Sequence, residues 1–183
     1  MKKVFLVFLL INLNNVALSS IKENIISNLV NTKNLSFNFE QNINGKVQSG
    51  NCIIEYPKKI FCKYNELNNK FLVSNGKSLL IKTQNETYYR YSIESTPLNY
   101  ILDKNFLINE IKKLKERIVK NKFINFTILK DQNEINIFFD INSFNLIGWQ
   151  TLDIYQNLNI TYISSLEKNK MLKKNIFKLP SIN

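Results

Sequence analysis

The sequence contains no histidine among its 183 residues and only two cysteines. Without imidazole, Ser/His and Cys/His catalysis, a histidine general base and histidine-ligated zinc are all excluded. Two cysteines alone cannot complete a structural zinc site either. Carboxylate chemistry stays possible, but residues such as Asp103, Glu110 and Asp153 form no paired arrangement in the sequence. We therefore expect no catalytic residue, no metal site and no cofactor.

Glycine and proline are also scarce, with four and three residues respectively, and no Gly- or Pro-rich linker divides the chain. No internal repeat is present either. The length suits a single domain with a substantial hydrophobic core. A composition of 44% apolar and 21% charged residues is typical neither of a disordered chain nor of an integral membrane protein.

Positive charge is in excess, since the formal net charge is +11. Asn, Ile and Lys are nevertheless all abundant, with 30, 25 and 23 residues, and all three have A/T-rich codons, so drift in base composition is the simplest explanation. The densest basic stretch, residues 112–122, is interrupted by Leu114, Ile118 and Val119. Nucleic-acid-binding proteins usually cluster their charge. We therefore expect no nucleic-acid binding; weak attraction to an anionic membrane surface is a more natural consequence.

The first nineteen residues have the layout of a secretory signal peptide. Lys2 and Lys3 precede an uncharged apolar run over residues 4–11, and a polar stretch with small residues follows up to Ser19. The run is too short to cross a membrane as a helix, which takes about 20 apolar residues; an uncleaved N-terminal anchor is the alternative. We predict a signal peptide over residues 1–19 and a mature domain over residues 20–183. No cysteine lies near the cleavage point, so no lipid anchor is expected.

The two cysteines flank a turn at Pro57, between short runs over residues 51–55 and 60–64. Pairing the runs about Pro57 places Ile54 opposite Ile60 and Cys52 opposite Cys62 on one face of a hairpin. An oxidising compartment favours a disulfide between them, while two free buried thiols are the alternative.

In the remaining chain, apolar residues recur with one of two spacings, that of a helix or that of a strand. Apolar residues at helical spacing predict helices over residues 21–29, 96–102 and 107–118, with Thr96 as the cap and Pro97 in the first turn of the second. Period-two alternation, as in Leu35, Phe37 and Phe39, predicts strands, and Asn75-Gly76 predicts a hairpin with a type I′ turn. The expected strands beside the cysteine hairpin cover residues 35–39, 71–74, 77–81, 87–93, 126–130, 134–140, 146–155, 159–166 and 176–179. This pattern predicts one antiparallel β domain of about ten strands, large enough to curl or close.

In this order and spacing, several segments resemble the LolA family of periplasmic outer-membrane lipoprotein carriers, over nearly all of the mature chain. Tyr56-Pro57-Lys58-Lys59-Ile60 stands where the family has Arg-Pro-Gly-Lys-Phe, and Leu72 to Lys77 matches its Val-x-Asp-Gly-Lys hairpin. The other matching segments are Phe37-Asn38-Phe39-Glu40-Gln41, Gly50, Tyr91 to Leu98, Leu146 to Asp153, and Ile160 to Ile163.

The resemblance implies a mainly β (α+β) fold, an unclosed antiparallel barrel of about ten or eleven strands with short helices as a lid over an apolar cavity. It implies a monomeric periplasmic chaperone without enzymatic activity that binds the acyl chains of triacylated lipoproteins. Its expected partners are the inner-membrane ABC transporter that releases lipoproteins, and an outer-membrane acceptor or the outer membrane itself. The alternatives are a related barrel for a glycolipid or fatty acid, a sensor of envelope stress, or an exported enzyme that uses carboxylates.

Seven residues are the candidates for the cavity and lid, although each could equally pack in an ordinary core: Phe37, Phe39, Leu98, Ile101, Leu102, Phe139 and Trp149. Tyr56 departs from the family pattern, because most members have an arginine there that helps to hold the lid by hydrogen bonds. A phenol has neither the charge nor the several donors of a guanidinium. Arg90 or Lys58 is a possible substitute.

Overall fold

The computed structural model describes residues 20–65, 69–152 and 156–181. The predicted signal peptide, residues 1–19, lies outside the described residues. No helix in the described part of the chain is long and apolar enough to span a membrane.

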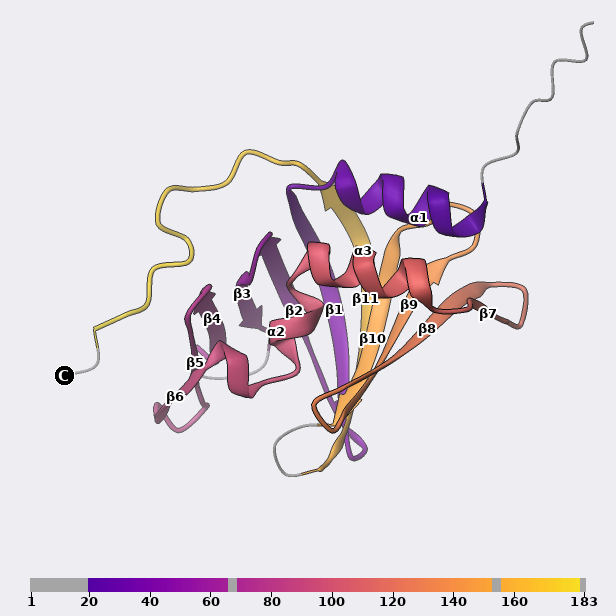
Figure 1. The fold of residues 1–183 in the computed structure, drawn as a ribbon. Helices are drawn as coiled ribbons and strands as arrows, with labels where there is room; N and C mark the ends of the chain where they lie inside the picture. The colour runs from indigo at the N-terminus through magenta and orange to yellow at the C-terminus, as the bar shows by residue number, and fades with distance from the viewer. Residues whose placement is uncertain (1–19, 66–68, 153–155, 182–183) are drawn as a thin grey trace, which may run out of the picture.

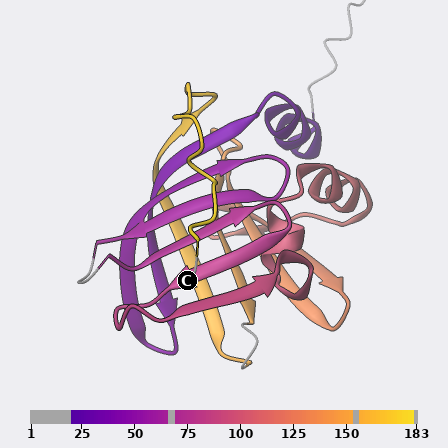
Figure 2. The ribbon, with the colours of Figure 1, turned by 90° about the vertical axis from the view of Figure 1, so that its left-hand side faces the viewer.

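Eleven antiparallel strands form one strongly curved sheet (Figure 1 and Figure 2). Their order is β6-β5-β4-β3-β2-β1-β11-β10-β9-β8-β7, and the edge strands β6 and β7 do not pair with each other, so the barrel is unclosed. The strands are β1 (Asn34–Ile43), β2 (Lys46–Glu55), β3 (Lys59–Tyr64), β4 (Phe71–Asn75), β5 (Ser78–Lys82), β6 (Tyr88–Ser92), β7 (Arg117–Val119), β8 (Phe123–Lys130), β9 (Asn133–Asp140), β10 (Leu146–Leu152) and β11 (Leu158–Lys168). The expected fold class is confirmed.

Four short helical segments accompany the sheet: α1 (Ile21–Val30), the 3₁₀ turn η1 (Ile93–Ser95), α2 (Leu98–Ile101) and α3 (Lys104–Lys113). Helix α1 begins at a capping box formed by Ser20 and Glu23, and Asp103 caps α3. In Figure 1, α2 and α3 lie across the concave face of the sheet. Lys104 ties the two longer helices together, because its ammonium donates to the carbonyls of Val30 and Thr32 at 3.1 and 2.8 Å, at the C-terminal end of α1.

The core lies between these helices and the concave face. Strands with strict alternation point one apolar row inward, and Ile135, Ile137 and Phe139 of β9 are all fully buried. Leu107 and Ile111 of α3 are equally buried. The packing of these rows fixes the sheet register, because a one-residue slip would expose the whole row.

The cysteine hairpin has the expected register. Cys52 lies opposite Cys62, and Ile54 lies opposite Ile60. The two sulfur atoms are bonded, with the Cα atoms 4.1 Å apart.

Two local expectations are wrong, and one strand was not expected. The helix predicted over residues 107–118 ends at Lys113, and Ile118 instead lies in the edge strand β7, opposite Ile124 of β8. Residues 176–179 form no strand; Phe177 and Leu179 lie in a segment that packs outside the sheet, near Lys59 and Phe61. The strand β7 was not expected, because three residues are too few to show alternation.

The turn chemistry also differs from expectation in two places. The Thr96 hydroxyl donates to the Ile93 carbonyl at 2.9 Å and closes η1, so it does not cap α2. In the β4–β5 hairpin only Gly76 has a positive φ, whereas a type I′ turn needs two. The Asn75 side chain stabilises this turn instead, accepting from the amides of Lys77 and Ser78 at 3.0 Å each.

Candidate functional site

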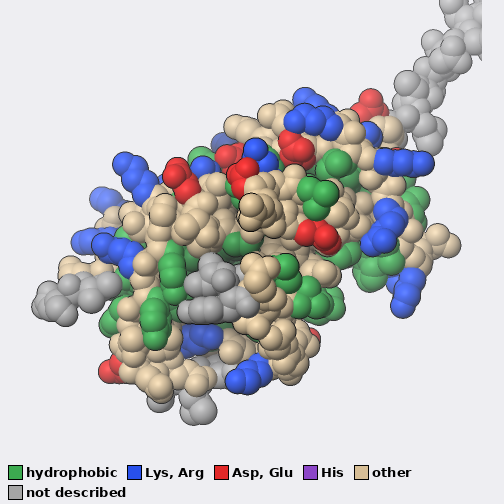
Figure 3. Space-filling view, turned by 60° about the horizontal axis from the view of Figure 1, so that its bottom comes forward, with side chains coloured by type: hydrophobic (Ala, Val, Ile, Leu, Met, Phe, Trp, Pro, Cys, Tyr) green, Lys and Arg blue, Asp and Glu red, His purple; other side chains and the backbone are tan. Residues whose placement is uncertain are grey.

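An apolar cavity of about 280 Å³ lies on the concave face, between helix α2 and residues of strands β1 to β6, β10 and β11. Figure 3 views the molecule from the lower end in Figure 1 and shows apolar side chains at the surface of this end. The lining residues are Phe39, Gln41, Ile43, Cys52, Ile60, Cys62, Tyr64, Lys70, Leu72, Leu79, Ile81, Tyr91, Thr96, Pro97, Leu98, Ile101, Trp149, Thr151, Leu152, Asn159 and Thr161. Lys70 is the single charged side chain among these residues. Such a surface suits a ligand that is mainly hydrocarbon.

Four of the seven candidate residues line this cavity: Phe39, Leu98, Ile101 and Trp149. The other three, Phe37, Leu102 and Phe139, are not among its lining residues and are at most 3% exposed in the packed core. Phe37 meets the edge of Trp149 at 6.5 Å between ring centroids, and Phe139 packs in the same way on Phe126. These three residues therefore belong to the packed core and not to the cavity lining.

The sequence reasoning missed much of the lining, including the disulfide itself and the apolar residues of β4 and β5. Cys52 and Cys62 present their bridge to the cavity, next to Leu72 and Leu79. The alternation of side chains along each strand could have identified these residues. Leu72 lies opposite Cys62 on the neighbouring strand, so both side chains are on the same face of the sheet. By the same reasoning, Gln41 is on the same face of β1 as Phe39, which lies two residues earlier in the strand.

A side-chain hydrogen bond connects helix α2 to the turn between β8 and β9. The Tyr100 hydroxyl donates to the Asp131 carboxylate at 2.5 Å, in the turn between β8 and β9. This hydrogen bond is the main cause that lowers the pKa of Asp131 below its ordinary 3.8. The same bond raises the pKa of Tyr100. Asp131 is exposed, so the contact holds α2 only lightly.

The lowered pKa of Asp131 predicts how the stability provided by the Tyr100–Asp131 hydrogen bond depends on pH. Because the folded state lowers the pKa of Asp131, the contact stabilises the protein above pH 3.8 and is lost as the pH falls through the lowered value. Asp131→Asn should therefore have a lower Tm than the wild type near neutral pH, and the difference should disappear at strongly acidic pH. Thermal melts of both proteins across this range check it; a difference independent of pH would assign another role to Asp131.

No curated protein matches the chain. A family model described as outer membrane lipoprotein carrier protein LolA matches residues 30–180, which includes every strand of the sheet and the whole cavity. The chain belongs to the LolA family. Proteins of this family and their relatives are periplasmic carriers or binding proteins for lipids or lipoproteins.

Solved structures share the LolA-like fold at very low identity. The crystal structure of MucB matches with a TM-score of 0.50 and 10% identity over 87% of this chain and 62% of the MucB chain. An uncharacterised conserved protein from Thermus thermophilus matches with a TM-score of 0.50 and 6% identity, over 87% of this chain and 92% of that one. A LolA superfamily protein from Nitrosomonas europaea matches with a TM-score of 0.47 and 8% identity, over 87% and 96%.

Tyr56, which the resemblance matches to an arginine of the LolA family, is not among the residues that line the cavity. Its ring lines a small gap beneath α1, beside Leu29 and Leu146, and its hydroxyl is buried without a hydrogen-bond partner in the described part of the chain. Burial raises the pKa of this phenol far above its ordinary value, so it stays neutral. Tyr56 thus packs beneath α1, and among the described residues its side chain makes no hydrogen bond of the kind that the resemblance implies for the family arginine.

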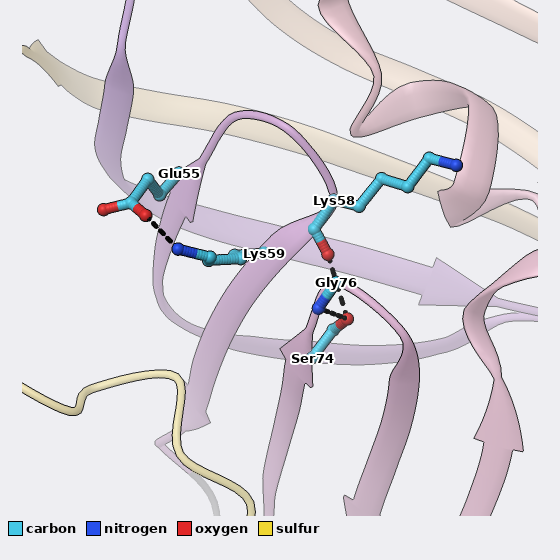
Figure 4. Close-up of polar contacts among 5 residues, drawn as sticks. All are labelled: Glu55, Lys58, Lys59, Ser74 and Gly76. Atoms are coloured by element: carbon cyan, nitrogen blue, oxygen red, sulfur yellow. Dashed lines mark hydrogen bonds and ion pairs between the residues drawn. The ribbon is translucent and has the colours of Figure 1, made fainter.

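In this LolA-family chain the backbone of Lys58 is hydrogen-bonded to the end of α2. Its amide donates to the carbonyl of Leu102, at the end of α2, at 2.8 Å. Its own carbonyl accepts from the fully buried Ser74 hydroxyl at 2.9 Å, and that hydroxyl oxygen also accepts from the Gly76 amide (Figure 4). The β2–β3 turn, the β4–β5 turn and the end of α2 are therefore joined through one residue. An ion pair between Glu55 and Lys59 spans the base of the β2–β3 turn.

Lys58 adopts this position at a conformational cost. Its φ is 63°, in the left-handed region that favours glycine, and the resemblance to the LolA family matches this position to a glycine. A residue with a Cβ is less stable there by about 1–2 kcal/mol, partly offset by the greater freedom of an unfolded glycine. Lys58→Gly should raise the free energy of unfolding by about 1 kcal/mol, measured by urea denaturation. The control Lys63→Gly, in the extended backbone of β3, should lower it; an equal response of both variants would contradict this explanation.

Proposed function

We propose that this protein is a periplasmic carrier that binds the acyl chains of triacylated lipoproteins and delivers them to the outer membrane. The observation that supports the proposal is the apolar cavity bounded by β1, β3, β10 and α2 in a member of the LolA family. Each methylene left in water costs about 0.8 kcal/mol. A protein that moves acyl chains through an aqueous compartment must therefore cover them.

The size of the cavity implies that α2 moves during loading. A volume of about 280 Å³ is at the lower limit of pockets for drug-sized ligands, far too small for three long acyl chains. Two hydrogen bonds from the described part of the chain connect helix α2 to turns of the sheet: the Lys58 amide bonds to its end, and the exposed Asp131 accepts from Tyr100. Displacement of α2 enlarges the cavity without breaking any strand pairing, because α2 is not part of the sheet.

The proposed transport cycle involves one partner at each membrane. An inner-membrane ABC transporter supplies the lipoprotein, and an outer-membrane acceptor or the outer membrane itself receives it. Moderate affinity suits this role, because the cargo must leave again. The predicted signal peptide over residues 1–19 agrees with a periplasmic location.

Native mass spectrometry of the mature protein tests the proposal. The protein is purified from the periplasm of cells that overproduce a triacylated lipoprotein. We expect a 1:1 complex with the acylated form and none with an unacylated version of the same lipoprotein. A complex with a glycolipid or a free fatty acid in place of the lipoprotein would contradict the carrier function and support a different cargo.

A further inference from the structure

Polar side chains gather at one end of the otherwise apolar cavity. They come from neighbouring parts of the sheet, toward the end where β1 turns into β2 (Figure 1). We call this set the polar band; its members are Gln41, Tyr64, Lys70, Thr151, Asn159 and Thr161, all in the cavity lining and interspersed with Ile43 and Leu152. The cavity wall at the opposite end, against α2, is mainly apolar and includes Leu98, Ile101, Ile60 and Leu79; the Thr96 hydroxyl in this wall donates to the Ile93 carbonyl. The cavity is thus amphipathic along its length.

Hydrogen bonds run along most of the band. The Lys70 ammonium donates to Gln48 and lies 4.1 Å from the centroid of the Tyr64 ring. The Tyr64 hydroxyl donates to the side-chain oxygen of Gln41 at 3.3 Å, and the Gln41 amide donates to the Thr161 hydroxyl at 3.4 Å. These last two bonds are long for their types, so a ligand can replace them at small cost.

The chain of bonds stops at Asn159. This residue lies beside Thr161 along β11, opposite Thr151 on β10 and Ile43 on β1. Its side-chain oxygen is buried and has no hydrogen-bond partner in the described part of the chain. A buried acceptor without a donor is unfavourable, and a donor from a ligand would satisfy it.

We propose that the polar band is a subsite for the neutral polar junction of an acylated molecule, with the Asn159 oxygen accepting the N–H of an amide-linked acyl chain. This inference rests on the proposed function and specifies its substrate class. An N-acylated, S-diacylglyceryl cysteine has one such N–H and two ester carbonyls. The ester carbonyls accept from Tyr64 and Thr161, and the acyl chains extend toward α2.

The same geometry disfavours an ionised fatty acid. A carboxylate has no donor for the Asn159 oxygen and would face its partial negative charge. Lys70, the single cation of the lining, already engages Gln48 and the face of Tyr64. The subsite therefore distinguishes an amide-linked lipid from a free acid by hydrogen bonding.

The experiment compares two synthetic ligands on the mature protein by calorimetry. One is an N-palmitoyl-S-dipalmitoylglyceryl cysteine peptide; the other is identical but carries a methyl group on the acyl amide nitrogen. We expect the wild type to bind the N–H form about fivefold more tightly, the size of one buried hydrogen bond. In Asn159→Leu this ratio should fall to about one. Asn38→Leu, on the exposed face of β1, should keep the wild-type ratio.

Asn159→Val removes the same side-chain oxygen and introduces a residue that is favoured in strands. This variant replaces Asn159→Leu in the comparison if the leucine variant does not fold. A wild-type ratio near one, or a ratio that persists in both Asn159 variants, would overturn the subsite while the carrier function stands. Binding of neither ligand to the wild type would overturn the proposed function as well.

Discussion

Leu98→Glu should weaken acyl-chain binding at least tenfold while the protein folds and is exported normally. Leu98 is only partly buried on α2 and faces the cavity, so an acid there is tolerated when the cavity is empty. With a ligand bound, the charge would have to be buried against hydrocarbon without a partner, and the apolar contact of the leucine would be lost. That contact alone is worth roughly 1.5–3 kcal/mol when fully formed, which corresponds to a tenfold change or more.

Leu129→Glu is the matched control for this variant. Leu129 is 75% exposed at the end of β8 and does not line the cavity, so the same substitution should leave binding unchanged. Binding is measured as the dissociation constant for a triacylated peptide, and circular dichroism checks the fold of both variants. Wild-type affinity in a folded Leu98→Glu protein would refute the assignment of α2 as the lid.

Removal of the disulfide should have the largest effect on stability. Cys52→Ala combined with Cys62→Ala should lower the free energy of unfolding by about 3 kcal/mol, because the bridge closes a loop across a sequence separation of 10 and restricts the unfolded chain. The bridge also lines the cavity, so the double variant should bind acyl chains somewhat less tightly.

Guanidinium denaturation of the double variant and of the reduced wild type measures this effect. Both should lose a similar amount of stability, since both lack the cross-link that restricts the unfolded chain. A loss confined to the double variant would attribute the effect to packing of the sulfur atoms instead.

The sheet was largely predictable because its strands carry a strong local signal. Apolar and polar residues alternate over much of 34–43 and 133–140, and an antiparallel sheet buries one face of each strand. The cysteine hairpin was predictable to the register, since Pro57 fixes the turn and apolar residues on both sides mark the inner face. In contrast, Leu114 and Ile118 are four residues apart and fit a helix equally well. The conformation of Ile118 is decided by pairing of β7 with β8, a contact that local spacing does not encode.

The site was less predictable, because a filled core and a hollow one use the same residues. Phe37 and Phe39 are two residues apart on one face of β1, yet only Phe39 lines the cavity. The difference is set by what packs opposite: Trp149 lies against Phe37 within the core, whereas Phe39 contacts the edge of Tyr64 at 5.1 Å near the polar band. Tyr56 shows the same limit, since its place under α1 follows from tertiary packing.

Trp149 allows the most direct test of the central claim, which is that acyl chains enter the cavity. It is the single tryptophan of the chain, it is 5% exposed, and it lines the cavity. The measurement is its fluorescence on titration with a triacylated peptide whose acyl chains carry bromine, a quencher that acts at contact. We predict strong, saturable quenching by the brominated chains, and little with the same peptide brominated in its water-soluble part. Saturable binding of the acyl-brominated peptide without quenching would place the chains outside the cavity and contradict the account.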